Sequence, residues 1–309
     1  PCLVDGIDAY EEMNKSKLRV HNLFLALLFR IHDCSRLASF PVLVFPAATA
    51  AKSSCWIPAF LSPRGGHRYF STSRKMSSGS TTDDSSQSPS LFLKKLDAPA
   101  AQRNKEPIWQ ILSQKVFAVA PRHRPLRILQ IAEGSGVHVS HFATRLASMM
   151  EEKFIWYPAD CDPAYRASIA AYIQDEQLDR LGVQPPLPLT LDANGIQESS
   201  TATLIGAEPL DLILCINMIH ISPWDATLGL MKVAGHRLDE SGVLFCYGPY
   251  KEGGTAVASN LAFDENLKSR NPAWGVRDLE QVSQAASNQG LQLVDKVDMP
   301  ANNLCLVFR

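Results

Sequence analysis

A turn with two glycines and an acid is the sharpest chemical feature of this sequence. Glu133-Gly134-Ser135-Gly136 directly follows the apolar run 126–132 and precedes a segment with helical apolar spacing. Glycines let a backbone approach a ligand closely, and a helix N-terminus presents free N–H groups, so the turn suits a nucleoside-type ligand. Val139 stands where a dinucleotide fingerprint needs a third glycine, which disfavours a pyrophosphate. Many strand-to-helix turns carry two glycines for geometry alone, and that interpretation stays open.

Polar groups also follow the next three apolar runs. Asp160 ends the run 154–159, where a carboxylate can accept hydrogen bonds from ribose hydroxyls. Asp192 ends the run 187–191 and could receive an adenine amino group, although a solvated turn acid is the simpler interpretation. Asn217 and His220 follow the run 210–216. Because open α/β sheets bind ligands at the carboxyl edge of their strands, these positions matter more than the residue types.

His220 has the side chain best suited to a general base near neutral pH, while a structural role is the commoner one for a lone histidine after a strand. Tyr247-Gly248-Pro249-Tyr250 opens a long segment, 248–276, which we expect to be a loop that serves as a lid or binding loop. Pro300-Ala301-Asn302-Asn303 forms the final turn, where asparagines also suit left-handed backbone geometry.

The elements that must position these residues alternate along the chain. We expect strands over 126–132, 154–159, 187–191, 210–216, 243–247, 291–297 and 304–308, and helices over 108–119, 137–150, 164–181, 227–238 and 278–288. Pro107 suits the first turn of the first helix, Asp162 and Asp278 suit helix caps, and Gly242 suits a turn. The pattern predicts a mostly parallel α/β sheet that ends in an antiparallel hairpin.

Composition narrows the class of protein. The formal net charge is −1, which argues against a protein held mainly by nucleic-acid backbone. The seven cysteines include no C-x-x-C pair, so neither a disulfide framework nor a metal site is expected, and a reducing compartment fits better.

The first 95 residues differ from the rest, and we expect a leader and linker there before a domain over 96–309. Residues 16–75 hold nine Lys or Arg against one acid, Asp33, which is typical of a mitochondrial transit peptide. A secretory segment at Leu23–Phe29, too short to span a membrane, and a stretch that is not translated are the alternatives. Translation from Met76 would remove the leader and leave a cytoplasmic or nuclear protein. Residues 77–90 form a serine-rich linker.

Taken together, the short sequence motifs of this chain resemble those of the methyltransferase-like protein 26 family. The resemblance runs from Arg103 to the C-terminus and rests on these strings: Arg103-Asn104-Lys105-Glu106-Pro107-Ile108, Gly134-Ser135-Gly136-Val137-His138, Pro158-Ala159-Asp160, residues 215–224, Tyr247-Gly248-Pro249-Tyr250, Ser259-Asn260, Phe263-Asp264, residues 274–278 and Pro300-Ala301-Asn302-Asn303. It implies a Rossmann-like class I methyltransferase fold and S-adenosylmethionine as cofactor. The implied cofactor residues are Gly134, Ser135, Gly136, Asp160, Asp192 and Asn217. The chain departs from the family pattern at Gln130, where an acid is usual, and at Glu133, where a small residue is usual.

The leading hypothesis is in-line methyl transfer to an unidentified acceptor, a reaction that depends above all on positioning. Asn217, His220 and Tyr247 would act at the reacting group. The residues expected to bind the acceptor are Arg103, Asn104, Asn260, Arg277 and Asn303. A small molecule or a protein side chain is favoured over nucleic acid, because no basic surface interleaved with aromatic residues is evident. A non-catalytic scaffold and a nicotinamide-dependent oxidoreductase are the alternatives.

Overall fold

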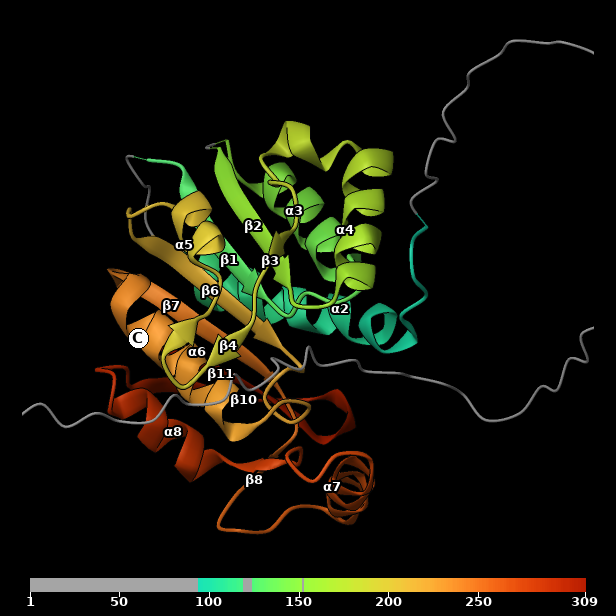
Figure 1. The fold of residues 1–309 in the computed structure, drawn as a ribbon, viewed down its shortest axis with the longest axis vertical. Helices are drawn as coiled ribbons and strands as arrows, with labels where there is room; N and C mark the ends of the chain where they lie inside the picture. Colours follow the sequence, from blue (N-terminus) through green and yellow to red (C-terminus); the bar gives the residue numbers. More distant parts are fainter. Residues whose placement is uncertain (1–93, 119–123, 152) are drawn as a thin grey trace, which may run out of the picture. The chain divides into compact units, whose positions relative to one another are not determined.

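A seven-stranded sheet forms the centre of the domain in a computed structural model, which describes residues 94–118, 124–151 and 153–309 (Figure 1). The strands lie in the order β10-β11-β7-β6-β1-β2-β3. They are β1 (Leu126–Ile131), β2 (Phe154–Asp160), β3 (Leu187–Pro188), β6 (Leu210–Ile216), β7 (Leu238–Gly248), β10 (Leu293–Met299) and β11 (Asn303–Phe308). Neighbours pair in parallel except β11, which is antiparallel to both β7 and β10. The sheet is mostly parallel and ends in an antiparallel C-terminal hairpin, so the predicted α/β fold class is confirmed.

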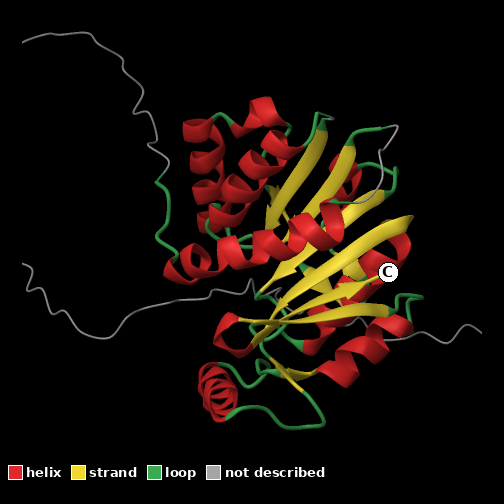
Figure 2. Cartoon of the chain, turned by 180° about the vertical axis from the view of Figure 1, so that it is seen from behind, coloured by secondary structure: helices red, strands yellow, loops and turns green. Residues whose placement is uncertain are grey.

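Side chains alternate across the strands and build one apolar layer on each face. On one face Ile128, Leu214 and Phe245 pack with α2 (Pro99–Leu112), α3 (Val137–Met149) and α4 (Pro163–Glu176). Figure 2 shows α2 lying across the strands on this face. Such all-buried strands read as continuous apolar runs, which is why β1, β2 and β6 were predictable to within a residue.

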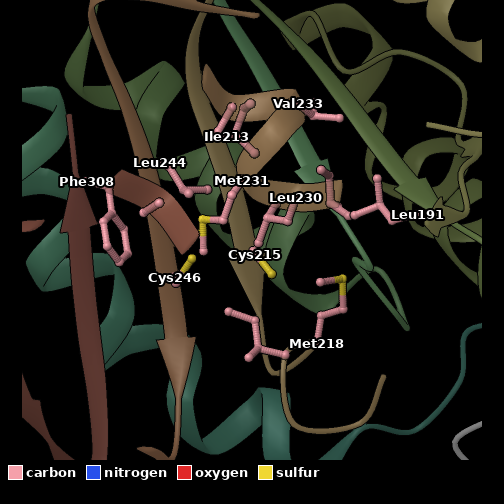
Figure 3. Close-up of a cluster of buried hydrophobic side chains, with 14 of the residues drawn as sticks. Leu191, Ile213, Cys215, Met218, Leu230, Met231, Val233, Leu244, Cys246 and Phe308 are labelled. Carbon is pink, nitrogen blue, oxygen red and sulfur yellow. The ribbon is translucent and has the colours of Figure 1, made fainter. Parts of the chain in front are cut away.

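The opposite face is covered by α5 (Ser199–Ile205), α6 (Trp224–Arg237) and α8 (Leu279–Ser287). Ile213, Leu244 and Phe308 project from the strands here toward Leu230 and Met231 of α6 (Figure 3). Cys215 and Cys246 lie opposite one another on β6 and β7 and are buried as reduced thiols.

Several expected elements differ from those observed. The first helix begins at Pro99 and continues as a π-helix (Ser113–Phe117), so Pro107 lies inside it. Segment 187–191 contributes only β3 to the main sheet; β4 (Leu191–Asp192) pairs with β5 (Gly195–Ile196) in a separate hairpin. Gly242 lies within β7, at an irregular part of the strand where the pairing with β6 shifts register between Leu238 and Val243.

The expected long loop holds helix α7 (Ala258–Arg270) and a short strand, β8 (Tyr250–Lys251), which pairs with β9 (Arg277–Asp278). Of the two predicted caps, Asp162 accepts the backbone N–H of Ala164 at 2.8 Å, whereas the Asp278 side chain makes no cap hydrogen bond. Two 3-10 turns, Leu178–Leu181 and Pro300–Asn302, complete the domain.

The predicted leader and serine-rich linker lie outside the described residues. Within the described ranges, no helix is long and apolar enough to cross a membrane. Nor do those residues hold a cluster of His, Cys, Asp or Glu that could bind a metal ion.

Candidate functional site

Two adjoining cavities open where the parallel strands end. The larger, of about 800 Å³, lies over the ends of β1, β2 and β6, and the smaller, of about 490 Å³, lies beyond the ends of β6 and β7. Four residues line both: Ala100, Arg103, Asn217 and Ile221. The first two belong to α2, whose N-terminal turns thus wall both cavities. A volume of several hundred cubic ångströms is typical of small-molecule sites.

The glycine turn forms one wall of the larger cavity, and Glu133 organises it. One Glu133 oxygen accepts the N–H of Gly136 at 2.6 Å and the other accepts the N–H of Val139 at 2.9 Å. Burial raises the pKa of Glu133 to about 8, although these backbone hydrogen bonds oppose the shift. Because the carboxylate occupies N–H groups at the start of α3, the helix offers fewer donors to a phosphate.

Gly134 and Gly136 serve different purposes. Both have left-handed backbones, with φ of +76° and +102°. A Cβ on Gly134 would meet nothing within 4 Å, and the residue lines the larger cavity, so its missing side chain leaves room for a ligand. A Cβ on Gly136 would lie 2.6 Å from the Tyr172 ring and 3.1 Å from the Ile169 Cα. Gly136 does not line the cavity among the described residues; it lets α3 and α4 pack closely.

Asp160 stands beside the turn at the end of β2. Its two oxygens accept the N–H groups of Gly134 and Asp162, each at 2.9 Å. Burial raises its pKa to about 6, again against the backbone hydrogen bonds. The wall of the larger cavity therefore holds two buried acids, Glu133 and Asp160, and a third acid, Asp97. Among the described lining residues, the basic side chains are Arg103 and one neutral histidine.

That histidine is His138, whose Nε2 lies 2.8 Å from the Asn104 Oδ1. An amide oxygen only accepts, so Nε2 carries the proton in this arrangement. Burial lowers the pKa of His138 to about 3, which leaves the imidazole neutral.

Ser168 connects the glycine turn to the segment before α2. Its hydroxyl donates to the Ser135 carbonyl at 2.5 Å, and the same hydroxyl oxygen accepts the N–H of Leu96 at 2.8 Å. The segment before α2 is thereby fixed to the glycine turn.

Asp192 lies outside the larger cavity, contrary to the prediction that it faces a nucleobase. Its side chain accepts the N–H of Asn194 at 2.7 Å within the β4–β5 hairpin, and its backbone packs on Gly229 of α6. The preceding residues Leu189, Thr190 and Leu191 line the cavity instead. They lack a chemical signature, so their types alone could not have identified them.

Asn217 connects the two cavities at the end of β6. Its φ of +59° is left-handed, and its N–H donates to the Tyr247 carbonyl at 2.8 Å. Asparagine tolerates this left-handed geometry better than most residues other than glycine. A Cβ added to Gly248 would lie 3.2 Å from the His220 Nδ1 and 3.7 Å from the Asn217 Oδ1, so both side chains pack over this glycine.

His220 lines the smaller cavity, and its ring meets Phe263 edge-on at 5.6 Å. Burial, with a smaller effect from Arg277, lowers the pKa of His220 to about 3. An imidazole with this pKa is neutral at pH 7 and a weak proton acceptor, which argues against the general-base role predicted for it.

The smaller cavity brings together most of the residues predicted to bind the acceptor. Arg103 and Asn104 reach it from α2, Tyr247 from β7, Asn260 from α7 and Asn303 from β11. Burial raises the pKa of Tyr247, while hydrogen bonds from Asn104 and Asn303 oppose the shift. The Asn260 amide donates to the Asn302 carbonyl at 2.8 Å and so ties α7 to the final turn.

Arg277 does not line either cavity among the described residues. Its guanidinium donates to the carbonyls of Ser222 at 2.9 Å and Ala273 at 2.6 Å, and it lies 5.9 Å from the Trp224 ring. Arg270 and Trp274 line the smaller cavity instead, with the guanidinium 5.4 Å from the indole. Arg270 was missed because α7 was predicted to be a loop.

Comparison with known proteins gives a family and several similar structures. A family model described as "Protein of unknown function (DUF938)" matches residues 95–309. Similar structures include an O-methyltransferase family protein from Burkholderia thailandensis (12% identity, TM-score 0.48, covering 68% of this chain and 59% of that one). Mitomycin 7-O-methyltransferase MmcR is another (13%, TM-score 0.49, 67% and 54%). A third is an O-methyltransferase family 2 protein from Planctomyces limnophilus DSM 3776 in complex with apigenin (16%, TM-score 0.47, 72% and 66%). The chain thus spans less than two thirds of the length of each of these proteins.

Proposed function

This chain belongs to the DUF938 family, to which no function is assigned, and we propose that it is an S-adenosylmethionine-dependent methyltransferase. The resemblance of its strings to the methyltransferase-like protein 26 family points the same way. The larger cavity would hold the cofactor and the smaller one the acceptor. When bound, the cofactor supplies an activated methyl group on a cationic sulfur.

The observation that carries this proposal is the pair of buried carboxylates, Glu133 and Asp160, beside the open position over Gly134. Buried acids of raised pKa gain most from a cation, because it favours their ionised forms. S-adenosylmethionine carries positive charge on its sulfonium and ammonium groups and a ribose whose hydroxyls suit Asp160. A pyrophosphate would instead meet two acids and a helix N-terminus already occupied by Glu133, so a nicotinamide dinucleotide fits poorly.

The chain's own residues would act mainly by positioning. Asp160 and the Gly134 backbone would bind the nucleoside part, and Asn217 would orient the reacting groups at the junction of the cavities. Helix α2 would cover both cavities and exclude water. Because methyl transfer needs in-line alignment, the shared wall formed by Arg103 and Asn217 supports transfer from one cavity to the other.

Calorimetric titration with S-adenosylmethionine and S-adenosylhomocysteine tests the proposal. We expect micromolar binding by the wild-type chain and at least a tenfold loss with Asp160→Asn, which keeps the side-chain shape but loses the charge and one of the two backbone hydrogen bonds, from Gly134 and Asp162. Asp225→Asn, on α6 outside both cavity walls, is the control. Absence of binding by folded protein would refute the proposal and favour a non-catalytic scaffold.

A further inference from the structure

The smaller cavity differs in charge from the larger one, and this difference constrains the acceptor. Its charged lining residues are Arg103 and Arg270, and its titratable neutral groups are His220 and Tyr247. The described residues that line it include no Asp, Glu, Lys or Cys. Hydrogen-bonding side chains are plentiful, from Asn104, Asn217, Asn260 and Asn303.

None of the described residues that line this cavity is suited to remove a proton from the acceptor. His220 is buried against Phe263 and Gly248, in surroundings that disfavour its cationic form. Tyr247 is buried and is ordinarily a protonated phenol. Glu133 of the glycine turn and Asp160 beside it line the larger cavity and not this one. A neutral alcohol or an ammonium ion would therefore arrive with a proton that nothing nearby accepts.

The two parts of the smaller cavity differ in polarity. Toward the junction lie Arg103 and Asn217, which also line the larger cavity. Arg103 is exposed, and the structure gives it no ion-pair partner in the described residues. The other part is mainly apolar and aromatic, with Phe263, Leu267 and Trp274 packed as one cluster that also includes Val276, and the Arg270 guanidinium lies 5.4 Å from the Trp274 ring. A planar body with an anionic group at one end matches both parts.

We propose that the acceptor is a small planar molecule whose methyl-accepting atom is already an anion, such as a carboxylate oxygen or a thiolate, held at the junction by Arg103 and Asn217. This inference rests on the proposed function. An anion's lone pair forms the bond to the methyl carbon while the carbon–sulfur bond breaks and its electron pair returns to sulfur. One anion and one cationic sulfur become two neutral groups, so no proton needs to leave.

Three probes of one shape and different charge test the acceptor class: 2-naphthoate, its neutral amide and 2-naphthylmethylammonium. Their binding to the full chain is measured by calorimetry in saturating S-adenosylhomocysteine, whose own affinity is measured first for every variant. We expect the carboxylate to bind at least tenfold more tightly than the amide, and the ammonium to bind most weakly. Failure of S-adenosylhomocysteine itself to bind would refute the proposed function, and the inference with it.

Arg103→Gln should reduce the preference for the carboxylate over the amide to threefold or less. Arg180→Gln, an exposed arginine outside both cavity walls, should leave the preference unchanged. With S-adenosylhomocysteine bound, three outcomes overturn the inference: equal or tighter binding of the amide or ammonium probe, no binding of any probe, or a preference that survives in Arg103→Gln. If Arg103→Gln also lost S-adenosylhomocysteine affinity, Arg103 would belong to the cofactor site and the inference would be wrong.

Discussion

The Glu133 carboxyl group accepts the backbone N–H of Gly136 at 2.6 Å, and it thereby places at the turn an acidic side chain that the first strand of this chain lacks. Gln130, three residues earlier, stands where the resembling family usually has an acid. Its amide oxygen instead accepts the Trp156 indole N–H at 3.1 Å in the interior. Glu133 thus fixes the glycine turn from its own first residue, and the substitution at position 130 leaves the turn ordered.

Glu133→Gln separates the charge of this side chain from its shape. Since the Glu133 pKa is about 8 in the folded chain, the acid is mostly protonated at pH 7 and the amide resembles it in charge. We expect the free energy of unfolding to fall by about 1–3 kcal/mol, because the amide NH2 cannot accept one of the two backbone N–H groups, of Gly136 and Val139, that Glu133 binds. S-adenosylmethionine affinity should fall about tenfold, because the ionised partner is lost. Denaturant unfolding and calorimetry measure the two effects, with exposed Glu240→Gln as control. Equal affinities would contradict this role.

Cofactor affinity should rise with pH between about 6 and 8. The raised pKa values of Glu133, about 8, and Asp160, about 6, mean that a bound cation must displace protons from the folded chain. The same pKa shifts also make the free energy of unfolding of the ligand-free protein depend on pH. Their stabilising contribution is complete below the pKa values of the unfolded chain, 4.5 for Glu133 and 3.8 for Asp160, and it is lost as the pH rises through the pKa values of the folded chain. Calorimetry in buffers of different ionisation enthalpy measures the protons released. Glu133→Gln should remove the release near pH 7.5, and proton uptake on binding would reverse the sign of the argument.

Gly134→Ala and Gly136→Ala form a matched pair. Both place a Cβ on a left-handed residue, at a cost of about 1 kcal/mol. At Gly134 the methyl group enters the cavity, so the fold should persist while cofactor affinity falls at least tenfold. At Gly136 it meets Tyr172 and Ile169, so we expect a stability loss of about 2–4 kcal/mol from overpacking. Thermal unfolding measures the loss of stability, and calorimetry measures the loss of cofactor affinity. A Gly136→Ala variant that is stable but binds the cofactor weakly would show that Gly136, and not only Gly134, leaves room for the ligand.

Much of the fold was predictable from the sequence because buried strands and the glycine turn have strong local patterns. Helix α7 was not, since two of its three buried positions are polar: Asn260 and Asp264, with Leu267. These residues have helical spacing, yet Asp264 is buried because Lys251 and Lys268 each donate to it at 2.7 Å. The first half of α2 was missed for a related reason: its N-terminal turns face cavities, so they carry no apolar repeat, and Pro107 was taken for the helix start.

Site residues were predictable where a polar type followed a strand, as Asp160 and Asn217 do. Position after a strand did not show which residues of this segment reach the cavity. Asp192 lies in the β4–β5 hairpin, whereas Leu189 and Thr190 line the cavity. The charge state of His220 depends on burial by Phe263 and Gly248, which come from distant segments. The protonation state of such a residue therefore depends on tertiary contacts, which the residue type alone does not reveal.

His138 and His220 should remain neutral throughout the range in which the protein stays folded. Burial lowers both pKa values to about 3, so neither ring should titrate between pH 8 and pH 5. Nitrogen-detected NMR of the imidazoles measures this directly, with urea-unfolded protein as the titrating reference. For His138 the spectrum should show the proton on Nε2, because that atom faces the Asn104 oxygen. Titration of His220 near pH 6.5 would restore it as a candidate base.

Arg277 should prove to be a structural residue. Its guanidinium donates to two carbonyls, of Ser222 and Ala273, which a lysine cannot reach with the same planar geometry. We expect Arg277→Lys to lower the free energy of unfolding by about 1–2 kcal/mol, the scale of one or two buried charged hydrogen bonds. Binding of S-adenosylhomocysteine and of 2-naphthoate at 10 °C, where the variant is folded, should stay within threefold of wild type. Arg103→Lys provides the contrast, with little change in stability and weaker naphthoate binding. If Arg277→Lys kept full stability and lost naphthoate affinity, Arg277 would be an acceptor ligand, as the sequence first indicated.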